Sequence, residues 1–201
     1  MQLYENSRSE FKFATRLHIN NVNLEKLPVV KILGIWLSED VTWTRNCKEI
    51  TIKAYSRLSM LTKLRYVGVS RADLLNIYVL YIRSVTEYCS VAFHSRLTQE
   101  QSNKLERIQK ICLKVILGEE YTSYDSALEM CGLQTLYSRR ENRCLDFALK
   151  CSKHQRNKRL FPLKAGKTKE KYVVNWARTE TYKNSAIPYC QRLLNEHAKK
   201  K

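Results

Sequence analysis

The sequence is poor in the residues that break helices, with five glycines and three prolines among 201 residues. Together with 44% hydrophobic residues, this scarcity is typical of a helix-rich globular protein and unlike a disordered chain. No stretch approaches the roughly 20 apolar residues that a membrane-spanning helix needs. The N-terminal segment MQLYENSRSE also lacks the apolar region of a signal peptide. We therefore expect an intracellular protein, nuclear or cytoplasmic, with no membrane partner.

Signatures of chemistry are scarce as well. The seven cysteines are odd in number and form no CxxC pair, which predicts reduced and mostly buried thiols. The chain has no GxxxxGK[ST], GxGxxG, GxSxG or HExxH motif. Cys144, Cys151 and His154, with Cys131, could be read as a metal site. Cys144 and Cys151 share an apolar helical stripe, however, so core packing is favoured and we expect no metal and no cofactor.

Clustered carboxylates, which two-metal phosphoryl transfer requires, are not evident. The acidic pairs Glu39–Asp40 and Glu119–Glu120 are not placed in a hairpin that would aim both side chains at one point. They read as charges of loops and helix ends. The four histidines have no nucleophile or acid arranged around them. We expect no catalytic residue and no independent enzyme activity.

Acidic residues are also outnumbered, since 36 lysines and arginines face 19 aspartates and glutamates. The net charge of +17 and the pI of about 9.7 predict an electrostatic field that attracts polyanions. RNA, DNA or an RNA–DNA hybrid is the leading candidate for a partner. The alternative is an ordinary solvated basic surface.

Two stretches near the N-terminus predict strands. Residues 11–19 alternate apolar and polar side chains, as a half-buried strand does. Residues 29–37 are apolar on both faces of a strand, and Gly34 in the middle indicates either a bulge or a close approach of another backbone. The sheet element is too small to stand alone.

From Thr44 the apolar period changes to that of a helix, with one stripe running from Cys47 to Leu64. The opposite face combines cations, hydroxyls and one aromatic ring, with no acid among them. Such a face can contact successive phosphates without reading base sequence, and the aromatic ring could stack on a sugar or base. Its members are Arg45, Lys48, Tyr55, Ser56, Ser59 and Lys63.

Three capping residues, Ser70, Thr98 and Thr135, predict three further helices. We expect the helix after Ser70 to be the most buried one. The helix after Thr98 ends at Gly118 and turns Arg107, Lys110 and Lys114 outward. A short helix covers about 124–132. Arg140 lies on the apolar stripe of the helix after Thr135, so we expect Asp125 or Glu129 to pair with it.

After His154 the chain is basic and has no sustained apolar period, which is typical of a linker or arm. A short helix is predicted at Pro188–His197. The expected fold class is α+β and predominantly α. Residues 1–42 would form a short N-terminal β-hairpin, residues 43–154 a helical bundle, and residues 155–201 a basic C-terminal arm with the short helix.

The order of these pieces resembles a known family. VKILGIWLSEDVTWTRNCKEITIKAYSRLSMLTKL, then YIRSVTEYCSVAFHSRLTQEQSNKLERIQKICLKVIL, then ALEMCGLQTLYSRRENRCLDFALK and finally ARTETYKNSAIPYCQRLLN are collinear with one region of that family. The region is the C-terminal part of the reverse transcriptase of jockey-like non-LTR retrotransposons. The family's C-terminal signature is matched by Arg178, Thr179, Tyr182, Ser185 and Pro188.

The resemblance implies that Leu33, Gly34 and Ile35 belong to a primer-grip element at the end of a palm, followed by a thumb-like bundle. The strand would be apolar on both faces because it lies between palm and thumb, and the first helix would face template and primer. The palm aspartates, including the [FY]xDD hairpin that binds Mg²⁺ in the family enzyme, would precede Phe11.

We therefore expect a non-catalytic C-terminal fragment of an RNA-directed DNA polymerase that holds nucleic acid by its phosphate backbone. The missing palm and fingers region would be a further partner. The alternative is a protein-interaction or self-associating module, because apolar N-terminal strands without a palm would expose an unpaired edge.

Overall fold

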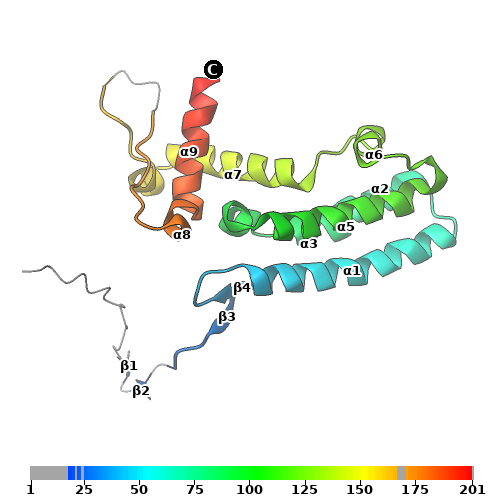
Figure 1. Ribbon diagram of the computed structural model, residues 1–201, viewed down its shortest axis with the longest axis horizontal. Coiled ribbons are helices and arrows are strands. Elements are labelled where there is room, and N and C mark those ends of the chain that lie inside the picture. Colours follow the sequence, from blue (N-terminus) through cyan, green and yellow to red (C-terminus); the bar gives the residue numbers. More distant parts are fainter. Residues whose placement is uncertain (1–17, 21, 24, 167–170, 201) are drawn as a thin grey trace, which may run out of the picture.

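The structure, a computed structural model, describes residues 18–20, 22–23, 25–166 and 171–200 (Figure 1). Helices dominate, and two small antiparallel hairpins lie near the N-terminus, so the expected α+β, predominantly α fold class is confirmed. The strands are β1 (His18–Ile19), β2 (Val22–Asn23), β3 (Val29–Ile32) and β4 (Ile35–Ser38). The longer helices are α1 (Thr44–Tyr66), α5 (Gln99–Leu117), α7 (Leu136–Lys153) and α9 (Ala186–Lys199).

Strands β3 and β4 form a hairpin whose register pairs Ile32 with Ile35. Leu33 and Gly34 make the two-residue turn, with φ of 47° and 85°, which is the backbone of the tight turns that join antiparallel strands. The expectation of one strand through residues 29–37 is therefore wrong, because Gly34 serves the turn rather than a bulge or a close approach within a strand. Of the strand expected at residues 11–19, only His18 and Ile19 lie within the described residues, in β1.

The period-3.6 stripe of α1 is confirmed. Its buried apolar residues are Cys47, Ile50, Ala54, Leu58 and Leu61, and they pack against α5 and the helices between α1 and α5 to form the first core. Helix α5 begins with the predicted capping box, in which Thr98 and Gln101 each bind the other's backbone amide. Eight residues of α5 are buried, so this helix is the central one.

The helix after Ser70 comprises α2 (Arg71–Ile77), a π-helical segment η1 (Tyr78–Arg83) and α3 (Ser84–Glu87). The Ser70 cap is confirmed by its contact with the amide of Asp73, at 3.2 Å. This helix is not the most buried one, contrary to expectation: Leu80 is 75% exposed. Cys89, with φ of 51°, then turns the chain into α4 (Ser90–Phe93) and the 3₁₀ turn η2 (His94–Arg96).

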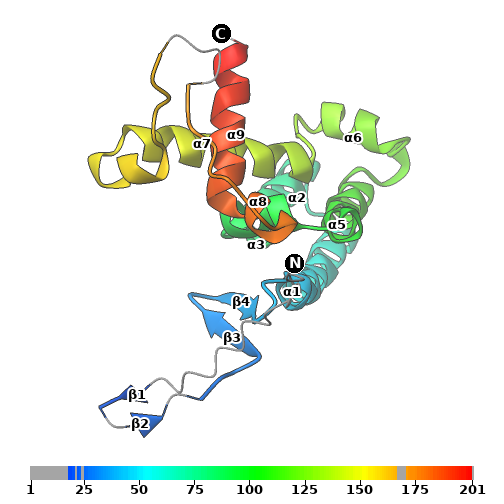
Figure 2. The same cartoon turned by 60° about the vertical axis from the view of Figure 1, so that its left-hand side comes forward.

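Helices α1 and α5 lie side by side and run in the same direction (Figures 1 and 2). At their N-terminal ends the Gln101 amide donates to the Thr44 hydroxyl at 3.2 Å. At their C-terminal ends the Arg65 guanidinium covers Gly118. The chain then passes through η3 (Gly118–Glu120) and α6 (Tyr124–Met130) to α7.

The N-terminus of α7 is fixed to α5 by a carboxylate. Glu106 of α5 accepts hydrogen bonds from the backbone amides of Leu136 at 3.0 Å and Tyr137 at 3.2 Å. Amides in the first turn of a helix have no partner within the helix, so an outside acceptor stabilises this end. The Thr135 cap is confirmed, because its hydroxyl accepts from the amide of Ser138 at 3.1 Å.

A second core joins α7 and α9, with Cys144, Ala148, Cys190 and Leu194 at its centre. Phe161, only 3% exposed, packs into it from the segment expected to be an arm. That segment contains η4 (Gln155–Leu160), a β-bridge between Leu163 and Tyr172, and α8 (Glu180–Lys183). Part of the expected arm is thus packed across the boundary expected at residue 154. The helix predicted at Pro188–His197 is confirmed as α9.

Candidate nucleic-acid interface

The outer face of α1 carries the predicted side chains in the predicted place. All six residues are exposed, on the side of the helix opposite the buried stripe. From Arg45 to Lys63 the row covers about 27 Å, at 1.5 Å of rise per residue. The members of this α1 row are Arg45, Lys48, Tyr55, Ser56, Ser59 and Lys63.

Not every member of the α1 row is free. Arg45 pairs with Glu49 at 2.9 Å and lies 4.9 Å from the ring centre of Trp36. The row contains no acid among its members, but Glu49 neutralises part of its charge in the first turn of α1. The Ser59 hydroxyl donates to the carbonyl of Ser56 at 2.7 Å, within the helix itself. Lys48 and Lys63 are exposed and have no ion pair within the described part of the chain.

A second row of cations lies on α5. Arg107, Lys110 and Lys114 are exposed, as predicted. The Lys110 ammonium is 4.8 Å from the ring centre of Tyr124, and that of Lys114 is 5.2 Å from Tyr121. A cation above an aromatic face keeps its positive charge, so these contacts hold the ammonium groups in place without neutralising them. The two rows therefore lie on neighbouring, parallel helices.

The residues that the resemblance assigns to a primer grip occupy the tip of the β3–β4 hairpin. Leu33 is 85% exposed, whereas Ile35 is partly buried against the first core. The Tyr88 phenol donates to the carbonyl of Leu33 at 2.9 Å, and its ring lies 3.5 Å from the position that a Cβ on Gly34 would take. The tip is thereby held over the end of α3.

The hairpin is also fixed to the first turn of α1. The amide of Trp36 points away from β3 and donates to the side-chain oxygen of buried Asn46 at 3.2 Å. Arg45 covers the Trp36 ring from the same turn of α1. An outward-facing amide of β4 is therefore bonded to α1, and the hairpin and the start of the α1 row are held together.

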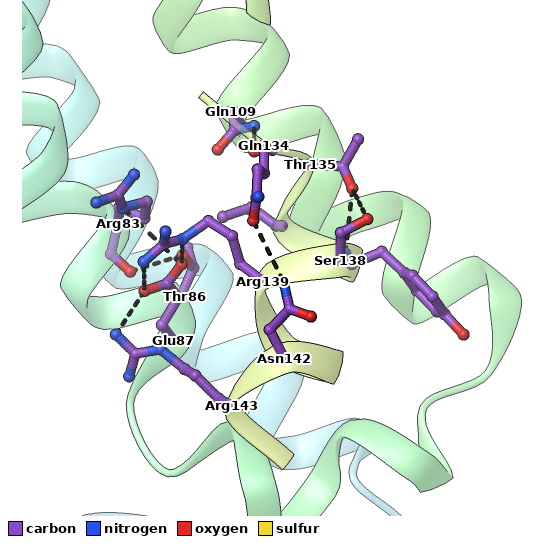
Figure 3. Close-up of polar contacts among 12 residues, drawn as sticks. Arg83, Thr86, Glu87, Gln109, Gln134, Thr135, Ser138, Arg139, Asn142 and Arg143 are labelled. Atoms are coloured by element: carbon purple, nitrogen blue, oxygen red, sulfur yellow. Dashed lines mark hydrogen bonds and ion pairs between the residues drawn. The ribbon is translucent and has the colours of Figure 1, made fainter. Parts of the chain in front are cut away.

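A charged cluster that the sequence analysis did not single out ties α3 to α7 (Figure 3). The Glu87 carboxylate, only 2% exposed, binds the Arg139 guanidinium through two hydrogen bonds and the Arg143 guanidinium at 2.8 Å. Arg83 is 3.8 Å from the same carboxylate. The bond to Glu87 raises the pKa of Arg139, whereas burial lowers that of Arg83. Three guanidinium groups around one carboxylate leave an excess of positive charge.

Only tertiary structure brings this cluster together, because Glu87 and Arg139 are 52 positions apart. The run RRENR at residues 139–143 is the one signal of the cluster in the sequence.

Arg140, the second arginine of this run, is fully buried, as its place on the apolar stripe predicts, but neither Asp125 nor Glu129 pairs with it. Its guanidinium instead donates to the Ser102 hydroxyl at 3.0 Å, and burial lowers its pKa. The predicted partners were wrong because Asp125 and Glu129 are exposed on α6, whereas the Arg140 side chain is fully buried.

No group of three or more potential metal ligands occurs among the described residues. Cys144 is buried in the second core, and burial raises its thiol pKa to about 12. The acidic pairs take part in surface contacts: Glu39 pairs with Lys26 at 2.5 Å, and Glu120 with Arg71 at 2.8 Å.

None of the described helices is both long and apolar enough to cross a membrane. Comparison of the chain with family models, with curated proteins and with solved structures finds no match in any of the three.

Proposed function

We propose that this chain binds nucleic acid through the phosphate backbone, with the α1 row as the main contact surface. The observation that carries the proposal is the exposure of Lys48 and Lys63 on one face of a rigid helix, with no ion pair to a described residue. The α5 row on the neighbouring helix and the net charge of +17 support it. Contacts of this kind position a duplex without reading its bases.

The test is fluorescence anisotropy with a labelled RNA–DNA hybrid of about 16 base pairs, titrated at several salt concentrations. We expect Lys48→Gln/Lys63→Gln to weaken binding at low salt and to reduce the salt slope by about two, because each lysine neutralises one phosphate. The matched control is Lys104→Gln/Lys183→Gln, which removes the same charge from lysines already paired with Glu100 and Glu180. Equal weakening in both variants would overturn the proposed surface.

We further propose that the chain serves as the thumb-like, non-catalytic part of a retrotransposon RNA-directed DNA polymerase. The resemblance of the sequence supports this role, and so does the hairpin tip beside the start of α1, where Leu33 and Gly34 are exposed and Ile35 is partly buried. The test is long-read sequencing of the locus upstream of the Met1 codon. An in-frame palm with the [FY]xDD hairpin is the expected result, and a frame closed by stop codons would contradict the role.

A second candidate function is self-association or binding of another protein. The observation that favours it is the exposure of Ile32 by 50% and Leu33 by 85% on the described part of the hairpin. Light scattering after size-exclusion chromatography discriminates between the two functions. A dimer that becomes a monomer on Leu33→Asp would favour this candidate, whereas a monomer at all concentrations would remove self-association.

A further inference from the structure

We propose that the cavity between α7, α9 and the segment after η4 takes an unpaired nucleotide of a single strand, with its base in the cavity and its phosphates on the rim. This inference rests on the proposed nucleic-acid binding and adds a second, distinct site. The cavity has a volume of about 590 Å³, within the usual range of ligand pockets. It lies in the second core, away from the α1 row.

The interior of the cavity is apolar and includes two aromatic rings. Leu149 and Leu194 line it from α7 and α9, and Phe161 and Tyr172 line it from the segment between these helices. The backbone at Tyr172 is held from both sides by Asn195, which accepts from its amide at 2.8 Å and donates to its carbonyl at 3.0 Å. The half-buried Tyr172 is therefore held in place and offers the surface on which a base would stack, whereas Phe161 is only 3% exposed and lies beneath it in the wall.

The rim of the cavity is cationic. Lys153, Lys158 and Lys171 are exposed at its edge, beside the half-buried His197, and no acid occurs among the described residues that line it. This pattern is complementary to an anion with a flat apolar body. Three separate ammonium groups fit a strand, which carries a phosphate on each side of every base, better than a ligand with a single carboxylate.

The test compares a labelled oligo-dT of about 12 nucleotides with an oligomer of the same length built from abasic sites. Wild-type protein should bind oligo-dT about fivefold or more tightly than the abasic strand, because only the former has bases to stack. Leu163→Asp places a carboxylate at the mouth, where Leu163 is 61% exposed, and should abolish this preference. The control Leu80→Asp, at a site 75% exposed on η1, should preserve it.

Two variants that lose the same charge distinguish binding at the cavity from general electrostatic attraction of the strand to a basic protein. Lys153→Gln/Lys158→Gln/Lys171→Gln should weaken oligo-dT binding several-fold more than Lys26→Gln/Lys104→Gln/Lys183→Gln, whose lysines are paired with acids. Equal weakening would overturn the inference. So would tight binding of a fluorescent dodecanoate that oligo-dT fails to displace, because the cavity would then hold an amphiphilic anion.

The two proposals fail separately. The cavity variants should leave binding of the hybrid duplex unchanged, whereas Lys48→Gln/Lys63→Gln should weaken it. If the cavity variants have no effect on the single strand while the α1 variants weaken the duplex, the cavity inference is wrong and the proposed function stands. If neither probe binds at low salt, both are wrong.

Discussion

The Tyr88 phenol donates a hydrogen bond to the carbonyl oxygen of Leu33 at 2.9 Å, across 55 positions of sequence. This bond fastens the tip of the β3–β4 hairpin to the end of α3, while Asn46 fastens its other edge to α1. Because the tip lies at the end of a two-stranded element, these two contacts decide how firmly it is held.

Tyr88→Phe should loosen the hairpin without unfolding the protein. The ring beside Gly34 remains and one hydrogen bond is removed, which is worth about 1 kcal/mol or less at a site that is 54% exposed. Amide hydrogen exchange should therefore speed up across β3 and β4 and stay unchanged in α5. Tyr66→Phe is the control, because Tyr66 is 92% exposed and no described residue bonds its hydroxyl. Equal exchange in both variants would show that the bond is not formed in solution.

Glu87→Gln should destabilise the fold strongly. The substitution removes the one buried carboxylate among three arginines, and the loss of one partner from a buried ion pair costs about 3–5 kcal/mol. Denaturant unfolding followed by circular dichroism measures the change. Arg143→Gln is the matched control and should cost about 1 kcal/mol or less, because the Arg143 side chain is 49% exposed. A near-neutral Glu87→Gln would contradict the structural role of the cluster.

The free energy of unfolding should fall at acidic pH, because the buried imidazole of His94 resists protonation in the folded state. Burial, with a smaller contribution from Arg140, lowers the pKa of His94 from 6.5 to about 4. Between these values the unfolded chain binds the proton and the folded one does not, so stability is full above about pH 6.5 and declines toward pH 4. At about 1.4 kcal/mol per pH unit, the loss approaches about 3 kcal/mol.

His94→Gln should flatten this dependence. The free energy of unfolding at pH 7 and at about pH 4.5 would differ less in the variant than in wild type. The exposed His154 provides the comparison, and His154→Gln should keep the wild-type dependence. A pH dependence that His94→Gln does not change would assign the acid sensitivity to other groups.

Gly118→Ala should be more destabilising than Gly132→Ala. Both glycines have positive φ, 58° and 61°, and Gly118 also has ψ of −122°, a combination that side chains with a Cβ tolerate less well than the left-handed helical region. A Cβ at Gly118 would also lie 2.9 Å from the Arg65 guanidinium, whereas nothing lies within 4 Å at Gly132. Thermal unfolding of the two variants measures the difference. Equal destabilisation would contradict both the larger backbone strain at Gly118 and the contact with Arg65.

Thiol reactivity should follow burial. Cys89 is exposed and should react first with a disulfide reagent at pH 7. Burial raises the pKa of Cys47 and Cys190 to about 11 and that of Cys112 to about 12, so these thiols should react only on unfolding. Mass spectrometry of partially labelled protein identifies the sites. Early modification of Cys112 would contradict the described first core.

The helices follow from local rules that the sequence displays directly. The stripe from Cys47 to Leu61 and the caps at Ser70, Thr98 and Thr135 specify their elements through contacts no more than a few residues apart. The exposed α1 row follows from the same period. It could be predicted because a residue opposite a buried stripe faces solvent whatever the rest of the chain does.

The remaining features depend on contacts between distant segments. The Leu33–Gly34 turn places leucine at positive φ, whereas the dipeptides that predict such a turn have Asn, Asp or Gly in that position. Arg140 bonds to Ser102, which is 38 positions away in the sequence, and Glu87 bonds to Arg139, which is 52 positions away. Phe161 lies in a stretch whose sequence is typical of a polar linker, and it is buried only because α9 packs over it. The cationic cavity is assembled from α7, α9 and the segment between, so no local pattern could reveal it.

The salt dependence of binding to the hybrid duplex tests the central claim most directly. If Lys48 and Lys63 each contact a phosphate, the logarithm of the association constant falls linearly with the logarithm of salt concentration. The slope should be about −2 or steeper, at about 0.9 per phosphate. Binding that is absent at low salt, or that does not change with salt, would contradict a phosphate-backbone interface.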